Sequence, residues 1–302
     1  MLKNPNMLRL LIVLAILAGI AAFACSSSGD SEERPTSIVL DNEGLVPIPG
    51  NSELVIGPNR FALALLNEDN RPILDEDVFL RFFYGEELKS EQQAGFTYAI
   101  PGANGFYTAN VNFDAAGQWT VEAVLTQDGA ETLVTFTFPV REESASPNVG
   151  DAAPASTNLT LATEPNIKRL STDQEPEPAL YETTVADAIA LGKPVVVVFA
   201  TPAFCQTRFC GPVVENVKEV RQDFLDTVTF IHIEPFDLDE EGQIVTTEDG
   251  GPSVSAPMLE WNLQTEPWVF VLNADGIVAA RFEGAASPTE LTAAIEAALG
   301  YY

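Results

Sequence analysis

Residues 195–216 read VVVVFATPAFCQTRFCGPVVEN and combine three kinds of local structure. The run Val195–Phe199 is wholly apolar, which is typical of a strand that is buried on both faces of a sheet. A short loop with Cys205 and Cys210 follows, and Gly211-Pro212 then begins a predicted helix, because proline is favoured in a first helical turn. The sequence therefore predicts two thiols between a buried strand and a helix N-terminus, where the helix dipole favours a thiolate.

Length and charge limit the classes of protein to which this chain can belong. Its 302 residues are long enough for two ordinary domains with cores of their own. Fifteen basic residues against 44 acidic residues give a net charge of −29, which repels nucleic acid and anionic lipid surfaces. We therefore expect no nucleic-acid partner.

The first residues have the anatomy of a secretory signal. A basic start is followed by the apolar run Leu10–Ala24, so residues 1–24 are predicted to be a signal peptide. Ala22-Phe23-Ala24-Cys25 resembles the lipobox of bacterial lipoproteins, and this resemblance implies that Cys25 is lipidated and becomes the mature N-terminus. The alternatives are an ordinary cleaved signal and an uncleaved N-terminal anchor. In each case we expect the protein outside the cytoplasm, with the lipid anchor at the extracytoplasmic face of a bacterial membrane.

Residues 25–42 are polar and acidic and predict a flexible tether, and residues 43–140 then alternate between apolar and polar positions. This period of two, interrupted by turn sequences, predicts an all-β sandwich of two antiparallel sheets. The apolar positions of its clearest runs are Phe61, Leu63 and Leu65; Tyr107, Ala109, Val111 and Phe113; Trp119, Val121, Ala123 and Leu125; and Val134, Phe136, Phe138 and Val140.

The stretch from Gly105 to Trp119 looks like the closing strands of bacterial extracytoplasmic immunoglobulin-like domains, some of which belong to copper-handling proteins. The resemblance implies an immunoglobulin-like sandwich. Residues 43–140 contain no His, Met or Cys, the side chains that copper prefers. We therefore expect this domain to be a spacer or a partner-binding module.

Residues 141–178 are rich in Pro, Ser, Ala and acidic residues and predict a linker, and residues 179–302 alternate between strands and helices. The predicted strands are Val195–Phe199, Val228–Ile233, Trp268–Leu272 and Ile277–Phe282, and predicted helices begin at Thr184, Gly211 and Ser287. This order predicts an α/β domain with one central mixed sheet and helices on both faces.

The second domain resembles the thioredoxin superfamily. The features that carry the resemblance are the apolar strand before the cysteines, Cys210-Gly211-Pro212, and Thr265-Glu266-Pro267 before the next strand. The resemblance covers roughly residues 179–299. It implies a thioredoxin-like fold, a cis peptide bond at Pro267 facing the sulfurs, no cofactor, and thiol–disulfide exchange with protein thiols through Cys205 and Cys210.

The cysteine spacing departs from that family. Four residues separate Cys205 from Cys210, and on a regular helix five steps advance about 7.5 Å, beyond the roughly 7 Å Cα limit for a disulfide. The pair can close only if Cys205 lies in the loop before the helix. Either cysteine can be aligned with the family nucleophile, and the charge of Arg208 between them would lower the pKa of either thiol. The strand also lacks the buried carboxylate of the family.

A structural disulfide in a non-catalytic cell-surface binding module is an alternative to exchange, because most extracytoplasmic cysteine pairs are structural. Copper delivery is another. His232 lies in a predicted buried strand, and its two interpretations are a hydrogen-bonded sheet histidine and a third metal ligand beside the two cysteines, as in thioredoxin-fold copper chaperones.

Residues 237–248 reproduce the oxygen spacing of a calcium loop. The candidate ligands are Asp237, Asp239, Glu241 and Glu248. The fifth position is Glu rather than Asp or Asn, and a strand rather than a helix precedes the loop. The alternative is a solvated acidic hairpin, so calcium is the weaker of the two interpretations.

Overall fold

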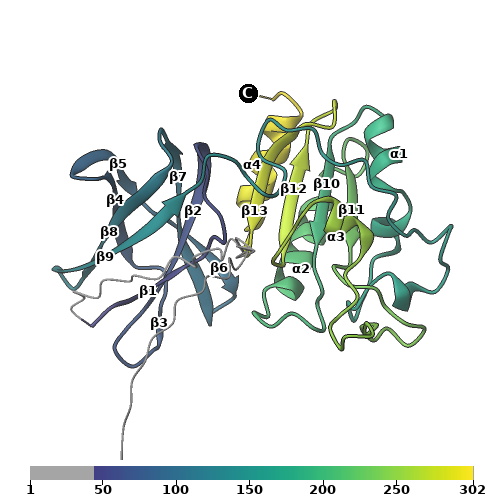
Figure 1. The fold of residues 1–302 in the computed structure, drawn as a ribbon, viewed down its shortest axis with the longest axis horizontal. Coiled ribbons are helices and arrows are strands. Elements are labelled where there is room, and N and C mark those ends of the chain that lie inside the picture. Colours follow the sequence, from purple (N-terminus) through teal and green to yellow (C-terminus); the bar gives the residue numbers. More distant parts are fainter. Residues whose placement is uncertain (1–43, 302) are drawn as a thin grey trace, which may run out of the picture. The chain divides into compact units, whose positions relative to one another are not determined.

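The computed structural model describes residues 44–301, which belong to one compact unit of residues 37–302. Three β-sheets and few helices make up this part of the chain (Figure 1). The predicted signal of residues 1–24, the lipidation site Cys25 and the predicted tether of residues 25–42 lie outside the described residues.

Two antiparallel sheets form the first part of the described chain, as the alternating pattern predicts. The first sheet has the order β1-β2-β7-β6, with β3 paired to β2, and the second has the order β5-β4-β8-β9. Their strands are β1 (Val46–Pro49), β2 (Gly57–Leu66), β3 (Pro72–Ile73), β4 (Asp77–Tyr84), β5 (Glu87–Gln93), β6 (Gly95–Ile100), β7 (Asn104–Phe113), β8 (Gly117–Gln127) and β9 (Ala130–Val140).

The core of this all-β part lies between its two sheets. Every apolar residue that the alternation of β2, β7, β8 and β9 pointed inward is buried there, including Trp119 at 0% exposure. Phe113 packs edge-on against Trp119 with ring centroids 4.8 Å apart, and the Trp119 indole N–H donates to the Ala115 carbonyl. The aromatic side chains thus fill the core and satisfy their polar atoms, as buried Trp requires.

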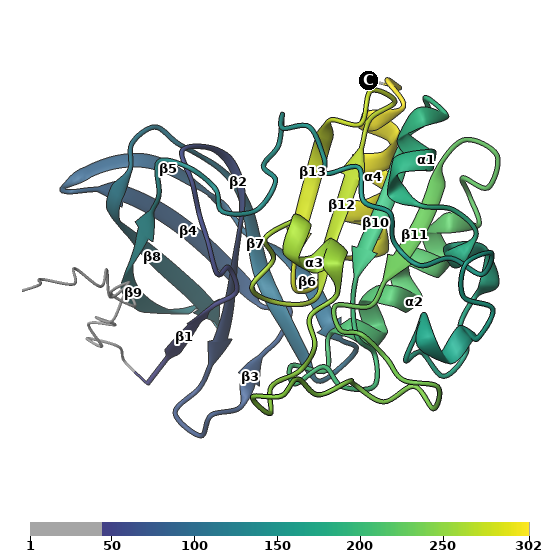
Figure 2. The same cartoon turned by 45° about the vertical axis from the view of Figure 1, so that its right-hand side comes forward.

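The third sheet has the order β11-β10-β12-β13 (Figure 2). Strand β10 (Val195–Phe199) pairs in parallel with β11 (Thr229–Ile233) and antiparallel with β12 (Trp268–Leu272), which pairs antiparallel with β13 (Val278–Glu283). The helices are α1 (Val185–Ala190), α2 (Cys210–Arg221), α3 (Ala256–Glu260) and α4 (Pro288–Ala298), with two 3-10 helices, η1 (Ile167–Arg169) and η2 (Pro178–Tyr181).

Helices cover both faces of this third sheet. Val196 and Val198 of β10 pack in one cluster with buried residues of α2 and α4. The alternate residues Val195, Val197 and Phe199 pack in a second cluster with residues of α1 and α3. Because both faces are covered, β10 has no polar side chain, which explains the uninterrupted apolar run in the sequence.

Residues 141–178, predicted to be a linker, make specific contacts with the third sheet. The Gly150 N–H donates to the Val278 carbonyl, and the Val278 N–H donates to the Asp151 carbonyl. Leu170 is buried in the core that contains α2 and α4. Much of this segment is therefore fixed against the sheet, although its composition is that of a linker.

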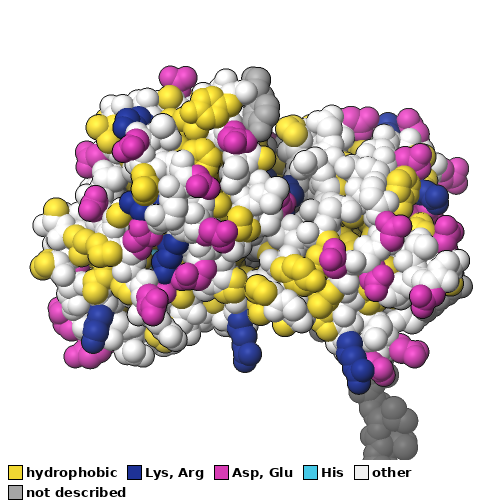
Figure 3. Space-filling view, turned by 180° about the vertical axis from the view of Figure 1, so that it is seen from behind, with side chains coloured by type: hydrophobic (Ala, Val, Ile, Leu, Met, Phe, Trp, Pro, Cys, Tyr) yellow, Lys and Arg dark blue, Asp and Glu magenta, His cyan; other side chains and the backbone are white. Residues whose placement is uncertain are grey.

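Acidic side chains are spread over the face of the molecule drawn in Figure 3 and do not gather in one place. This distribution agrees with the large negative charge of the sequence. Within residues 44–301, no helix is long and apolar enough to cross a membrane.

Candidate functional site

The two cysteines lie where the chain leaves β10 and enters α2. The Cys205 N–H donates to the Thr201 carbonyl at 3.0 Å, which closes a turn directly after the strand. Cys210 is the first residue of α2. Cys205 therefore lies in the loop before the helix, as closure of the pair requires, and the Cys210 N–H donates to the Cys205 sulfur at 3.4 Å.

The surroundings of the two sulfurs have opposite effects on their pKa values. A hydrogen bond from the Cys210 thiol, followed by bonds from the Thr207 hydroxyl and the N–H groups of Cys210 and Phe209, lowers the pKa of Cys205 to about 5 against the effect of burial. The same thiol–thiol hydrogen bond, together with burial, raises the pKa of Cys210. Both cysteines are free thiols in this structure. Cys205 is therefore the thiolate, and Cys210 is the thiol that donates to it.

The exposed surface of the two cysteines also differs in the direction that makes Cys205 the more reactive. Cys205 retains 9% of its surface, whereas Cys210 retains none. Since a thiolate is the nucleophilic form of cysteine, Cys205 has both the charge and the access that attack requires. Of the two alignments that the sequence left open, this geometry favours the one that makes Cys205 the nucleophile.

Arg208 lies between the cysteines with an exposed side chain and a φ of 63°, a left-handed conformation that is uncommon for a residue with a Cβ. Its N–H donates to the Cys205 carbonyl at 3.2 Å and closes the loop. Thiol, hydroxyl and backbone N–H groups are the causes that lower the pKa of Cys205. The electrostatic role of the Arg208 side chain stays a prediction.

The Glu266–Pro267 peptide bond is cis, as the resemblance implies. The Pro267 carbonyl accepts from the Gly284 N–H at 2.9 Å, which ties this loop to the end of β13. Burial, and then the charge of Cys205, raises the pKa of Glu266. Glu266 therefore borders the dithiol, a position that the sequence reasoning did not assign to it.

Glu234 is a second carboxyl that the sequence reasoning missed. It follows β11 directly and is buried, and Thr172 donates to its Oε1 through both the backbone N–H and the hydroxyl at 2.6 Å. Burial raises the pKa of Glu234 to about 7, and Thr201 also bonds to it. The Thr201 N–H in turn faces the Cys210 sulfur. Strand β10 has no carboxylate, and the buried carboxyl of Glu234 instead follows β11, the strand that pairs in parallel with β10.

Glu234 also lines a cavity of about 230 Å³ with Arg169 and Ser255. Its second oxygen, Oε2, is buried without a hydrogen-bond partner. A neutral carboxyl tolerates this environment better than a carboxylate does, which agrees with the direction of the pKa shift.

His232 is hydrogen-bonded through both ring nitrogens. The Tyr181 hydroxyl lies 2.7 Å from Nδ1, and Nε2 lies 2.8 Å from the Ala200 carbonyl oxygen. Burial lowers the pKa of His232 to about 4, so the ring is neutral at pH 7 and donates through Nε2 while it accepts at Nδ1. This is the hydrogen-bonded sheet histidine. Neither nitrogen is free to join Cys205 and Cys210 as a metal ligand.

Residues 237–248 form a turn and isolated bridges rather than a cluster of oxygen ligands. Asp239 Oδ1 accepts from the N–H groups of Glu241 and Gln243, and Asp237 accepts from the Ser253 hydroxyl. No group of three or more His, Cys, Asp or Glu residues in the described part of the chain is placed to hold a metal ion. Among the four candidate ligands, Asp237, Asp239, Glu241 and Glu248, the hydrogen bonds of the two aspartates favour the acidic hairpin, and calcium binding at this loop stays a prediction.

A family model described as YtkA-like matches residues 46–124, within the all-β part. No curated protein matches the sequence. Among solved structures, a thiol:disulfide interchange protein of the thioredoxin family from Chlorobium tepidum has 16% identity and a TM-score of 0.32, over 52% of this chain and 99% of that protein.

Two further solved structures align with one third of this chain at 13% identity. One is an engineered protein, with a TM-score of 0.24 over 20% of that protein. The other is the CARDB domain of the PF1109 protein from Pyrococcus furiosus, solved in complex with di-metal ions, with a TM-score of 0.20 over 92% of that domain. Scores this low carry no argument about this chain.

The first prediction concerns the reactivity of the two thiols in the reduced protein. Alkylation of Cys205 by iodoacetamide should rise with pH through a midpoint near 5, because its hydrogen-bond donors stabilise the thiolate. Cys210→Ala removes the strongest of these donors and should move the midpoint toward the ordinary value of about 8.5. Mass mapping of the labelled peptides gives both results. Faster labelling of Cys210 than of Cys205 would contradict the assignment.

The second prediction concerns Glu234. Because its pKa is raised in the folded state, folding binds a proton there, and the free energy of unfolding should fall as the pH rises toward about 7. Glu234 should cost the wild type roughly 2 kcal/mol of its free energy of unfolding between pH 5 and pH 8, and Glu234→Gln should not show this decrease. Urea unfolding at the two pH values measures it, with the exposed Glu182→Gln as the control. An identical pH dependence in Glu234→Gln and wild type would refute the buried-proton assignment.

Proposed function

We propose that this protein is a thiol–disulfide oxidoreductase with a thioredoxin-like second domain, acting on protein thiols through Cys205 and Cys210. The observation that carries the proposal is the pair itself. The Cys205 sulfur accepts hydrogen bonds at the N-terminus of α2 and sits beside the buried Cys210 thiol. A structural disulfide needs no such difference between its two sulfurs, whereas exchange needs one attacking thiolate and one resolving thiol.

The arrangement around the pair supports the fold part of the proposal. A parallel β10–β11 pair, two antiparallel strands after it, helices on both faces and a cis proline before β12 agree with the thioredoxin resemblance of the sequence. For the all-β part, two packed antiparallel sheets support an immunoglobulin-like interpretation.

The first step of reduction would be attack by the Cys205 thiolate on one sulfur of a substrate disulfide. A new sulfur–sulfur bond forms to Cys205 as the substrate bond breaks, and the other substrate sulfur leaves as a thiolate that takes up a proton. The N–H groups of Phe209 and Cys210 hold the Cys205 sulfur before attack. They favour the thiolate at neutral pH, which raises the fraction of reactive enzyme.

The second step would release the product. Cys210 loses its proton and attacks the Cys205 sulfur, which expels the second substrate thiolate and leaves a Cys205–Cys210 disulfide. Two electrons thus pass from the protein dithiol to the substrate disulfide. We assign the uptake of the Cys210 proton to Glu266, since its charge acts on Cys210 and its pKa is raised by burial and by Cys205. Oxidation of a substrate dithiol follows the same steps in reverse.

The last part of the proposal concerns where the protein is located in the cell. A signal at residues 1–24 and a lipid at Cys25 would tether the protein to the extracytoplasmic face of a bacterial membrane, where protein disulfides form and persist. Labelling of cells with a radioactive fatty acid should mark the wild-type chain and leave Cys25→Ser unmarked. Recovery of an unlabelled mature wild-type chain would remove the anchor from the proposal.

The exchange reaction itself is tested with the resolving cysteine removed. Cys210→Ser should accumulate a mixed disulfide between Cys205 and a scrambled protein substrate, because the second step is blocked. Cys205→Ser should give none, since the sulfur that remains is buried. Non-reducing gels and mass spectrometry measure the adduct. A wild-type pair that resists reduction by dithiothreitol, with no adduct in Cys210→Ser, would favour a structural disulfide.

A further inference from the structure

The first sheet of the all-β part has a second apolar face that is not part of its own core. On β2, Phe61 and Leu63 point into the core between the two sheets, and the alternate residue Ala62 is buried on the opposite side. Ala62 packs in a separate cluster with Ala99 of β6, Phe106 of β7 and Ala285 after β13. A strand facing water on one side carries polar residues there, so this face is built to be covered.

Phe209 of the thiol loop packs against this covered face. It is partly buried in the same cluster, and its ring meets the Phe106 ring edge-on with centroids 5.5 Å apart. Phe209 is also the residue before Cys210, whose N–H donates to the Cys205 sulfur. The Phe209 N–H donates to the Thr207 hydroxyl at 3.5 Å, and this hydroxyl lies 3.2 Å from the Cys205 sulfur. One residue therefore links the all-β part to the hydrogen bonds of the dithiol.

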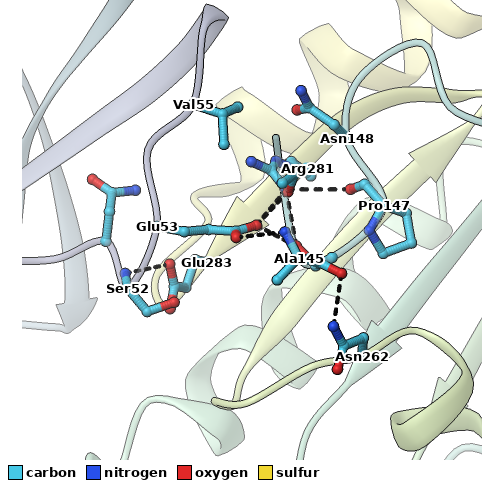
Figure 4. A network of polar contacts seen from close by, with 12 residues as sticks. Ser52, Glu53, Val55, Ala145, Pro147, Asn148, Asn262, Arg281 and Glu283 are labelled. Atoms are coloured by element: carbon cyan, nitrogen blue, oxygen red, sulfur yellow. Dashed lines mark hydrogen bonds and ion pairs between the residues drawn. The ribbon is translucent and has the colours of Figure 1, made fainter. Parts of the chain in front are cut away.

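The loop of residues 265–267, which contains Pro267 and precedes β12, is also linked to the all-β part. Glu283, at the end of β13, accepts from the Ser52 N–H through Oε2 at 2.8 Å (Figure 4). It also accepts from the Thr265 hydroxyl through Oε1 at 2.8 Å. Thr265 also accepts from the Trp268 indole N–H at 3.0 Å. Glu283 thus joins a residue of the all-β part to the residue two positions before Pro267.

Two ion pairs also join the all-β part to the part of the chain that contains the third sheet. Arg281 of β13 pairs with Glu53 at 3.0 Å (Figure 4). The hydroxyls of Ser144 and Ser146 bond to both partners. Arg60 of β2 meets Glu290 of α4 through two nitrogens at 2.6 and 3.2 Å. The second pair is bidentate, and the first is almost fully buried on both sides, so their geometry is more specific than that of an exposed ion pair.

These contacts carry an inference about how the site works. We propose that the all-β part is a positioning element of the dithiol site, in which Phe106 holds Phe209 so that the N–H groups at the start of α2 face the Cys205 sulfur. The inference rests on the proposed function for its effect on disulfide exchange. The effect on the Cys205 thiol itself does not depend on any substrate.

Covering Phe209 also determines where a substrate approaches. The side of the loop that carries Phe209 is occupied by Phe106, whereas Gln206, Thr207 and Arg208 are exposed. The side of the loop that carries Gln206, Thr207 and Arg208 is therefore the side left open to a substrate disulfide.

The test is Phe106→Ala in the full chain. Loss of the ring that supports Phe209 should weaken a hydrogen bond to the thiolate and move the pH midpoint of Cys205 alkylation upward by about one unit. Exchange with a scrambled protein substrate at a pH well below the wild-type midpoint should slow by up to roughly tenfold, because the thiolate fraction falls by that factor. Phe106→Leu, which keeps most of the apolar volume, should move the midpoint less.

The control is Phe79→Ala, which removes a half-buried ring from β4 in the other sheet. Its melting temperature reports the general cost of such a truncation, and its alkylation midpoint should equal that of wild type. An unchanged midpoint in Phe106→Ala, or an equal shift in Phe79→Ala, would overturn the positioning role. Wild-type protein that exchanges no disulfide, but whose midpoint still moves in Phe106→Ala, would refute the proposed function and leave the positioning role supported.

Discussion

The contact in which Cys210 donates its thiol and its N–H to the Cys205 sulfur is the one on which the dithiol depends. It exists because β10 ends at Phe199, a turn closes at Cys205, and α2 begins at Cys210 with its first N–H groups unpaired by the helix. A helix N-terminus offers such groups to any anion, and here the anion belongs to the chain itself. The charge that makes Cys205 reactive is thus supplied by backbone geometry and by the neighbouring thiol.

The sequence predicted this geometry well, since its determinants are local. The strands Val195–Phe199 and Trp268–Leu272 have the predicted bounds, and α4 begins after Ser287 as predicted, with a capping box formed by Ser287 and Glu290. The alternating runs of the all-β part also predicted its buried residues, because the period of two assigns each side chain to one face. Local periodicity and capping are readable without knowledge of tertiary contacts.

Features that depend on distant segments were not readable in the same way. Glu234 looked like one acidic residue among many, and only the parallel pairing of β10 with β11 brings it to the sheet edge where the thiol loop begins. Residues 141–178 have the composition of a linker and yet pair with β13. A usable signal existed for the covered face, since Ala62 and Ala64 occupy positions on β2 where a solvent-facing strand would carry polar residues.

The position of the covering residues in the chain has a consequence for synthesis. The all-β part is complete at Val140, but Arg281, Ala285 and Glu290, which contact it, are synthesised only after residues 141–280. Until they arrive, Ala62, Ala99 and Phe106 form an apolar surface that lacks part of its cover, and such surfaces invite association with other chains. A chain truncated before β13 would contain both cysteines but would leave this apolar surface of the all-β part incompletely covered.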